Sequence, residues 1–234
     1  MNAPKVQSKP SLAQVVALKK IKAPALLGAL RHNLREIISV AHEHRHAIDP
    51  GKSCHNVILR GARTSAEVKG FHNQLKEMNA IKRLRHDHVA ALEVVVSTPA
   101  SYSEPLSYFE AAVVFFERFW GQPIVSAVAH FDQPNPHAHI LVSPFANGRL
   151  IGSSLIGYRP QIAALARSFH TEVGKPFGFA LSPQLTVAER LAISNETIAQ
   201  LLQNPERALS GHLGHALRKI LFTSAERLRH IVAH

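Results

Sequence analysis

The chain has 234 residues, of which 46% are hydrophobic, and it carries a formal net charge of +11 at pH 7. This length provides one sizeable domain with a buried core and leaves room for an appendage. A single cysteine, Cys54, excludes an internal disulfide, and since no signal peptide or long apolar run is evident we expect a cytoplasmic protein that neither crosses nor binds a membrane.

The positive charge is distributed unevenly along the chain. Residues 1–90 hold 16 Lys and Arg against 6 Asp and Glu, whereas the remaining residues are nearly balanced. A basic half beside a neutral, strand-rich half indicates that a polyanion, most simply nucleic acid, lies across one surface. The alternative is a basic surface that serves only to keep the protein in solution.

Strand-like and irregular segments alternate in the first part of the chain. We expect a strand over 13–21, a small-residue loop over 23–30, a charged and histidine-rich loop over 41–53, and a second strand over 54–60. Thr64 or Ser65 is suited to cap a helix, because apolar residues recur after them at helical spacing. The β-branched run over 89–97 predicts a third strand.

The second part of the chain continues this mixture of helices and strands. Pro105 is expected in the first turn of a helix, and an amphipathic helix is expected over 159–173. Between them, two β-branched runs over 124–129 and 140–144 flank a Pro- and Asn-rich turn, which is typical of adjacent strands. This order predicts an α+β fold in which helices cover one face of an antiparallel sheet.

The pattern changes near residue 183, where we expect a domain boundary. Thr186 and Glu189 have the spacing of a helix capping box, and only helical patterns follow them. We therefore expect a catalytic domain over residues 1–183 and a helical segment over residues 184–234.

Three histidines at and after the turn carry the clearest chemical signal. His130 ends one predicted strand, while His137 and His139 lie two residues apart and so share a face of the next strand. Three imidazoles converging on a rigid sheet, with room left for substrate, are typical of an open catalytic metal site. We expect one divalent ion, Mn²⁺ as the one that supports activity, with Mg²⁺ or another divalent ion as the alternative. Since imidazole ligands favour borderline ions over hard ones, Zn²⁺, Co²⁺ or Ni²⁺ could occupy the site without supporting turnover. The competing interpretation is three ordinary histidines in a chain that has sixteen.

Three blocks of the sequence resemble motifs of the Mob/Pre (MOBV-type) plasmid mobilisation relaxases, a family of the HUH endonuclease superfamily. The blocks are His32-Asn33-Leu34-Arg35, then Ile48-Asp49-Pro50-Gly51-Lys52-Ser53 with His55-Asn56, and finally His130 to His139 with Asp132 and Pro136 between them. They occur in the order and spacing of that family, over about 150 residues. The resemblance is therefore carried by three motifs in register and not by one.

The resemblance implies a metal-dependent enzyme that nicks one DNA strand at an origin of transfer and stays joined to the 5′ end. It implies a five-stranded antiparallel sheet that presents the three-histidine metal site. It also implies that His32 is the nucleophile and Arg35 its partner in the first block. Neutral imidazole is a competent nucleophile, and the guanidinium of Arg35 could hold a phosphate through its two-pronged fork.

One position departs from the family pattern. The family has Glu where this chain has Gln133, and an amide cannot accept a proton as a base. Asp132, Glu36 or Asp49 could take over this role, and the sequence does not distinguish among them. Asp132 has a second possible role, in which its carboxylate fixes the tautomer of a metal-ligating histidine.

DNA and proteins of the relaxosome or coupling machinery are the expected partners, and no oligomeric state is predicted. Candidate DNA contacts are drawn from the basic half of the chain and from the first two blocks: Arg31, Asn33, Arg45, Lys52, Ser53, Asn56, Lys82, Arg83 and Arg85. The histidines at 42, 44 and 46 lie in the charged loop, so we expect them to contact phosphates and not a metal.

Two other functions remain open from the sequence. One is a rolling-circle replication initiator or a transposase-type HUH nuclease that uses a tyrosine such as Tyr158 as its nucleophile. The other is a non-catalytic repressor that binds the origin, with Gln133 marking the loss of cleavage.

Overall fold

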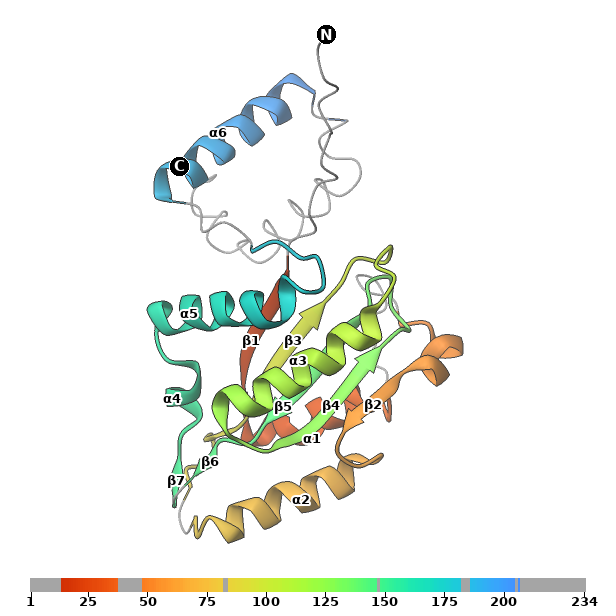
Figure 1. Ribbon diagram of the computed structural model, residues 1–234, viewed down its shortest axis with the longest axis vertical. Coiled ribbons are helices and arrows are strands. Elements are labelled where there is room, and N and C mark those ends of the chain that lie inside the picture. The colour runs from red at the N-terminus through yellow and green to blue at the C-terminus, as the bar shows by residue number, and fades with distance from the viewer. Residues whose placement is uncertain are drawn as a thin grey trace, which may run out of the picture. The chain divides into compact units, whose positions relative to one another are not determined.

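The structure is a computed structural model that describes residues 14–37, 48–81, 84–146, 148–181, 186–204 and 206. The chain divides into two compact units, Met1–Ser182 and Pro183–His234. The first unit contains all the strands of the described part, and the second contains helix α6, Val187–Gln203 (Figure 1).

A five-stranded antiparallel sheet forms the centre of the first unit. Its strands are β1 (Val15–Lys22), β2 (Val57–Arg60), β3 (Val89–Ser97), β4 (Ile124–His130) and β5 (His137–Val142). They are arranged in the order β1-β3-β5-β4-β2, and every neighbouring pair is antiparallel. A small second sheet pairs β6 (Phe145–Ala146) with β7 (Arg149–Leu150). The predicted α+β fold with a five-stranded antiparallel sheet is confirmed.

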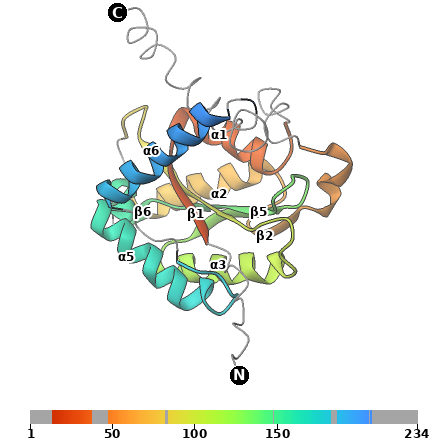
Figure 2. The same cartoon turned by 90° about the horizontal axis from the view of Figure 1, so that it is seen from above.

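Six helices accompany the sheet in the described part of the first unit. They are α1 (Ala23–Asn33), the 3-10 helix η2 (Pro50–His55), α2 (Ser65–Met78), α3 (Pro105–Trp120), α4 (Gly152–Ile156) and α5 (Arg159–Phe169), and a short π-helical turn, η3 (His170–Gly174), extends α5. Seen from above, α3 and α5 lie on one side of the sheet, and α1 and α2 lie on the other (Figure 2). The expectation that helices cover only one face is therefore wrong.

Two separate hydrophobic cores result from this arrangement. The core under α3 and α5 includes Phe116, Phe169 and the β5 residue Ile140. The core under α1 and α2 includes Leu30 and the next β5 residue, Leu141. Because side chains alternate along a strand, β5 is apolar on both faces near its middle, as a central strand must be when both faces are covered.

Local sequence signals account for most element boundaries. Strand β3 and the start of α3 at Pro105 lie where the sequence predicts them. Thr64, and not Ser65, caps α2. Its hydroxyl accepts a hydrogen bond from the Glu67 backbone N–H, and the Glu67 carboxylate accepts one from the Thr64 backbone N–H. The predicted capping box of Thr186 and Glu189 is likewise present at the start of α6.

Two predicted segments differ from the structure. Residues 23–30 form most of α1 and not a loop, because Pro24 lies in the first turn and the following Ala and Leu residues have high helix propensity. Residues 54–56 do not belong to β2. Asp49 accepts a hydrogen bond from the Gly51 backbone N–H and starts η2, so the strand begins only at Val57.

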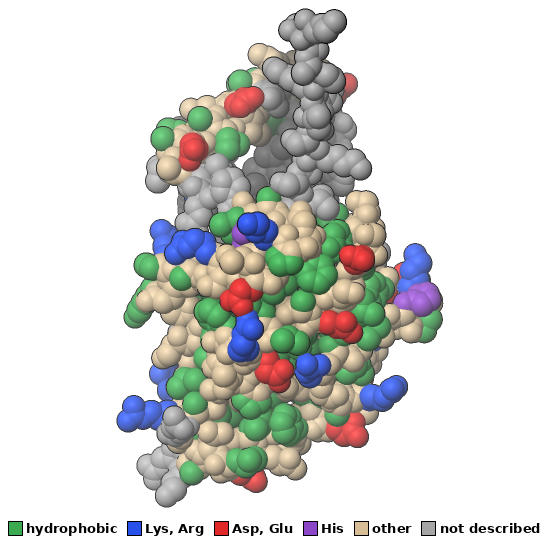
Figure 3. Space-filling view, viewed as in Figure 1, with side chains coloured by type: hydrophobic (Ala, Val, Ile, Leu, Met, Phe, Trp, Pro, Cys, Tyr) green, Lys and Arg blue, Asp and Glu red, His purple; other side chains and the backbone are tan. Residues whose placement is uncertain are grey.

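The outer surface on the α3 side of the sheet carries scattered charged side chains. Acidic and basic side chains are interspersed with hydrophobic ones on this side (Figure 3). Glu117 of α3 forms an ion pair with Arg60, and Arg118 forms one with Glu172. This pattern does not present a cluster of like charge to a polyanion. In the described part of the chain, no helix has both the length and the apolar composition needed to cross a membrane.

Candidate metal centre

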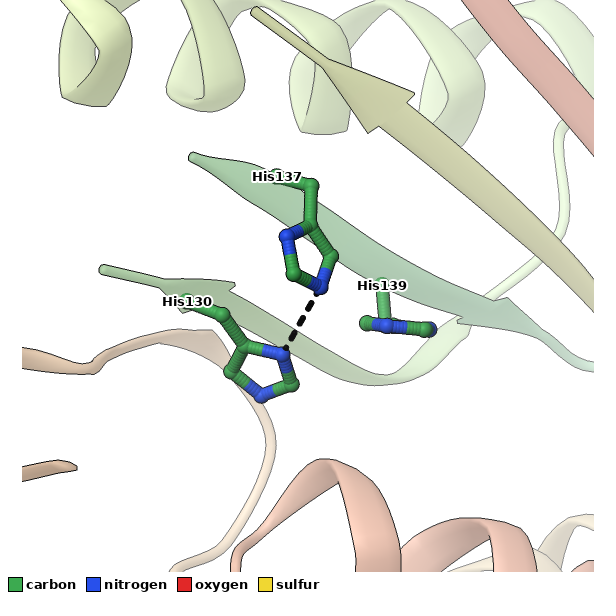
Figure 4. Close-up of side chains that lie close together, drawn as sticks. All are labelled: His130, His137 and His139. Atoms are coloured by element: carbon green, nitrogen blue, oxygen red, sulfur yellow. Dashed lines mark hydrogen bonds between the residues drawn. The ribbon is translucent and has the colours of Figure 1, made fainter. Parts of the chain in front are cut away.

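The three histidines of the third block meet at one end of the sheet. His130 and His137 are directly opposite each other in the β4–β5 pair, and His139 lies two residues further along β5. The three rings point toward a common centre (Figure 4). One nitrogen from each ring lies within 4.8 Å of the others, and His130 Nδ1 and His137 Nε2 are 3.3 Å apart. The predicted convergence of these side chains is thus present in the structure.

The other nitrogen of each ring contacts an oxygen of the protein. His130 Nε2 lies 2.7 Å from the backbone oxygen of Asn33, and His137 Nδ1 lies 3.0 Å from that of Asn135. His139 Nδ1 lies 2.9 Å from a carboxylate oxygen of Glu93. A carbonyl or carboxylate oxygen only accepts, so we assign the hydrogens to these outer nitrogens. The inner nitrogens then carry lone pairs directed at the common centre, which is the arrangement of metal-ligating histidines.

The protonation states favour the same conclusion. Burial lowers the pKa of His137 to about 4. Burial and the neighbouring cationic groups also lower the pKa of His130 far below its usual value. Both rings are therefore neutral near pH 7, which is the form that binds a metal ion. Two nitrogens that share an ion at about 2.0–2.1 Å in tetrahedral geometry are roughly 3.3 Å apart, as the nitrogens of His130 and His137 are. These residues fit a divalent ion.

His32 lies beside this centre. It is in the last turn of α1, and its ring centroid is 6.3 Å from that of His139. An open cleft of about 580 Å³ adjoins both rings. Its lining consists of Val15, His32, Val95, Ser97, Thr98, Pro99, Gln133, Pro134, Asn135, His137 and His139. One cleft is therefore lined by His32 together with His137 and His139 of the three-histidine cluster.

The three sequence blocks meet at the carboxylate of Asp132, whose side chain is fully buried. Arg35, from the first block, donates two hydrogen bonds to it, of 2.7 and 2.8 Å. Ser53 and Asn56, from the second block, donate bonds of 2.9 and 2.7 Å. Burial alone would raise the pKa of the Asp132 carboxyl, but these hydrogen bonds outweigh burial and hold the pKa well below its usual range.

Arg35 is consequently not a phosphate ligand, which corrects the expectation from the sequence. Its side chain is only 7% exposed, and its fork is turned toward Asp132. The same guanidinium donates to the backbone oxygen of His32 at 3.0 Å and to Oε1 of Gln133 at 3.1 Å. Arg35 has a φ of +58°, a left-handed conformation that is strained for a residue with a side chain. These bonds hold the strained turn, so Arg35 fixes the chain immediately after His32.

The other candidates for the missing acid serve helix starts. Glu36 accepts a 2.7 Å hydrogen bond from the Ser65 backbone N–H at the first turn of α2. Asp49 accepts from Gly51 at 3.0 Å at the start of η2 and forms a 3.3 Å ion pair with Lys52. Each carboxylate thus has a local structural role.

Glu93, not Asp132, supplies the carboxylate that fixes the tautomer of His139, and the sequence analysis missed it. Glu93 lies in the middle of β3, and burial would raise the pKa of its carboxyl. Hydrogen bonds from His139 and Asn33 outweigh burial and hold the pKa below its usual range. A lone carboxylate within the apolar run 89–97 is the sequence signal that could have identified it.

Three of the candidate DNA contacts form hydrogen bonds inside the protein. Asn33 is only 1% exposed and bonds to Glu93, while Ser53 and Asn56 direct their side chains at Asp132. Asn33 is too buried to contact a phosphate, so that prediction is wrong, whereas Ser53 and Asn56 are half-buried and their contacts with DNA stay a prediction.

The described basic candidates are on the surface. Arg31, Lys52 and Arg85 have side-chain exposures of 50%, 62% and 86%, and each is near an acidic partner. Arg45, Lys82 and Arg83, together with the histidines at 42, 44 and 46, lie outside the described residues. Tyr158, the alternative nucleophile, is 82% exposed at the start of α5 and does not line the cleft.

Comparison with known proteins identifies relatives of this chain. The family model described as "Plasmid recombination enzyme" (Mob_Pre) matches residues 11–181. A plasmid recombination enzyme of Streptococcus agalactiae is 30% identical over 60% of this chain and 30% of its own length. One of Lactiplantibacillus plantarum is 29% identical over 61% of this chain and 41% of its own length. The chain therefore spans 30% and 41% of the length of these two relatives.

Solved structures give a similar result. The MobM relaxase domain, crystallised with Mn and 22 nucleotides of the pMV158 oriT DNA at pH 5.5, superposes with a TM-score of 0.61 and is 25% identical, covering 77% of this chain and 99% of that domain. The same domain bound to a 3′-thiophosphate form of the DNA at pH 6.8 has a TM-score of 0.60 and 26% identity, with 77% and 98% coverage. The family match extends over most of the first unit, and the chain belongs to the plasmid recombination enzyme family, Mob_Pre.

Proposed function

We propose that this chain is the catalytic part of a DNA relaxase. It nicks one strand at the origin of transfer of a plasmid or mobile element and retains the 5′-phosphate on His32. The observation that carries this proposal is the single cleft that adjoins both His32 and the three-histidine centre. The related MobM domain holds Mn and origin DNA in its crystal structures, which supports the same substrate and ion here.

The proposed reaction transfers a phosphoryl group to an imidazole. A ring nitrogen of His32 attacks the phosphorus, an N–P bond forms and the P–O3′ bond breaks. The proton that His32 gives up balances the one that the departing 3′ oxygen takes up. A divalent ion bound by His130, His137 and His139 would neutralise charge on the phosphate and polarise a non-bridging oxygen.

The protein's own residues position the nucleophile. Helix α1 ends at Asn33, one residue after His32, and the Arg35 guanidinium donates a hydrogen bond to the backbone oxygen of His32 from the following turn. Asp132 in turn orients Arg35. Attack requires the ring nitrogen near the phosphorus in a fixed direction, and a network anchored on a buried carboxylate provides that rigidity. We propose that Arg35 and Asp132 are positioning residues.

The remaining assignments follow from the same proposal. We propose that residues 1–183 are the catalytic domain and that residues 184–234 are a separate helical segment, of which the structure describes α6. Mn²⁺ is the proposed ion because crystal structures of the MobM relaxase domain contain Mn, although imidazole ligands by themselves favour borderline metals such as Zn²⁺. Arg31, Lys52 and Arg85 are proposed phosphate contacts, and relaxosome or coupling proteins are proposed partners.

A second candidate function is favoured by one observation. Gln133 lines the cleft at the position where the family has an acid, and its Oε1 accepts from Arg35. An amide supplies no base, so the chain could bind an origin without cleaving it.

A nicking assay distinguishes these two functions. Supercoiled plasmid that carries the pMV158 oriT, or an origin from the protein's own replicon, is incubated with the full chain and Mn²⁺. Relaxation that requires Mn²⁺ and disappears in His137→Ala, with DNA binding retained, is the expected result. Tight, sequence-selective binding without relaxation after long incubation would favour the second function. Cleavage by His137→Ala at saturating Mn²⁺ would contradict the proposed centre.

A further inference from the structure

A two-residue link connects α1 to the metal-binding histidines. The side-chain amide of Asn33 donates to Glu93 Oε1 at 3.2 Å, and the same oxygen accepts from His139 Nδ1 at 2.9 Å. The backbone oxygen of Asn33 accepts from His130 Nε2 at 2.7 Å. One residue of α1 thus contacts one metal-binding ring directly and a second ring through a carboxylate.

The position of this link is unusual for polar groups. Asn33 is 1% exposed and Glu93 is 5% exposed. Glu93 lies in the middle of β3, on the face of the sheet opposite to its fully buried neighbours Leu92 and Val94. A carboxylate in such a place is costly unless it is paired, and losing a partner leaves an uncompensated buried charge. Lys19 adds only a distant ion pair, at 3.9 Å from a 71% exposed side chain. His139 and Asn33 are therefore its principal described partners.

We propose that Asn33 and Glu93 are positioning residues that fix the nucleophile-bearing end of α1 to the metal ligands. Glu93 holds His139 with its Nδ1 protonated, so that Nε2 faces the centre. Asn33 directly follows His32, so the bonds that place Asn33 also place His32 beside the rings. The inference rests on the proposed function, since it assumes that His130, His137 and His139 hold the ion.

The direct test measures Mn²⁺ binding to the full chain in the absence of DNA, by titration calorimetry or by the EPR signal of free Mn²⁺. Glu93→Gln keeps the size of the side chain and removes its charge. Loss of a carboxylate that orients a metal-ligating histidine weakens metal affinity by about 10- to 100-fold, and this is the expected effect. The matched control is Glu110→Gln, an exposed position on α3 that has the same charge change and should keep the original affinity.

Exchanging the amide of Asn33 and the carboxylate of Glu93 tests whether the two residues act through the hydrogen bond between them. Asn33→Asp replaces the donor by an acceptor and places two carboxylates together, so it should weaken Mn²⁺ binding at least as much as Glu93→Gln. In the double variant N33D/E93Q the amide N–H of residue 93 can donate to the carboxylate of residue 33. The amide oxygen of residue 93 then accepts from His139 in place of the carboxylate oxygen. The Mn²⁺ affinity of the double variant should exceed that of Asn33→Asp alone. A double variant as weak as the product of the two single effects would contradict a direct link.

Two further measurements separate this inference from the proposed function. His139→Ala should lose Mn²⁺ affinity, and if it does not, the proposed metal centre fails. Loss in His139→Ala with unchanged affinity in Glu93→Gln would overturn only the role of Glu93. If either variant proves misfolded by circular dichroism, ¹⁵N NMR of the metal-free wild-type protein decides the matter. The proton of His139 should be on Nδ1, and a proton on Nε2 would overturn the link.

Discussion

The two faces of the sheet are held together by different interactions. The face under α3 and α5 is closed by aromatic residues, with the rings of Phe116 and Phe169 stacked at 5.2 Å, and acidic and basic side chains lie on the outer surface of this side (Figure 3). The other face buries Asn33, Glu93, His130 and Asp132. Apolar packing stabilises the folded protein with little dependence on which apolar residues are in contact. A buried polar group stabilises it only when all of its hydrogen-bond partners are present. Substitutions on the first face should therefore affect stability at most, whereas substitutions on the second face should alter both stability and the site.

The largest expected effect comes from breaking the ion pair on the polar face. Arg35→Ala would leave the buried carboxylate of Asp132 without its two strongest donors. Removal of one member of a buried pair costs about 3–5 kcal/mol, and Arg35→Lys should restore little of it because an ammonium has no fork. Urea denaturation measures the change. A loss below about 1 kcal/mol in Arg35→Ala would show that Asp132 is held mainly by Ser53 and Asn56.

A second expected effect is a dependence of stability on pH that originates on the polar side. Burial lowers the pKa of His72 on α2 to about 4, and its ring packs on Phe145 with Nδ1 lacking a hydrogen-bond partner. The unfolded chain therefore binds a proton below its ordinary pKa of about 6.5, while the folded protein does not until about pH 4. Stability contributed by the neutral ring is present above pH 6.5 and falls as the pH falls from 6.5 to 4.

Thermal melts of the metal-free protein across this range check the sign. His137 has a similarly lowered pKa and contributes in the same direction. His72→Phe should flatten the pH dependence by up to roughly 1.4 kcal/mol per pH unit. Added Mn²⁺ should keep the part that His137 contributes and extend it to lower pH, because a metal-bound ring stays unprotonated in the folded protein. An unchanged slope in His72→Phe would mean that its ring is not desolvated.

A smaller effect is expected in the cleft. Gln133→Glu introduces a carboxylate in the lining beside Arg35, at the position where the sequence resemblance implies an acid. If proton transfer limits the present chain, the single-turnover nicking rate should rise by about 10-fold or more, within the range of general acid–base catalysis. Gln133→Ala is the control that removes the amide without adding a base. Equal rates in both variants would show that this position supplies no proton acceptor.

The smallest effect belongs to the aromatic face. Tyr108 is fully buried among aromatic rings, and its hydroxyl has no hydrogen-bond partner among the described residues. Tyr108→Phe removes an unsatisfied polar atom and keeps the packing, so the free energy of unfolding should stay the same or rise by about 1 kcal/mol. Mn²⁺ affinity should not change. A clear loss of stability would show that the hydroxyl is hydrogen-bonded in solution.

The sequence predicted what depends on neighbours along the chain. Strand β3, the Pro105 start of α3 and the two strands that bear the histidines follow from local alternation and capping residues. The predicted loop over residues 23–30 is wrong because small residues are common in both loops and helices. The packing of Leu26 and Leu30 in the core on this side of the sheet stabilises the helix.

The metal-binding rings were predictable because they lie on adjacent strands. Their supports were not. Asp132 and Arg35 form a hydrogen bond although they are 97 residues apart in the sequence, and Glu93 and His139 are 46 residues apart. No sequence periodicity predicts a contact over such separations. The resemblance located the residues of the three blocks but not the hydrogen bonds that Ser53, Asn56 and Asn33 form with buried carboxylates inside the protein.

The most direct test of the central proposal maps the covalent adduct. The full chain is incubated with Mn²⁺ and an oligonucleotide that spans the nick site, and the modified peptide is identified by mass spectrometry. The nucleotide should be attached to His32 through an acid-labile, alkali-stable phosphoramidate. His32→Ala should bind DNA and Mn²⁺ without forming an adduct, while Tyr102→Phe, Tyr108→Phe and Tyr158→Phe should each still form it. An acid-stable adduct on a tyrosine would contradict the account.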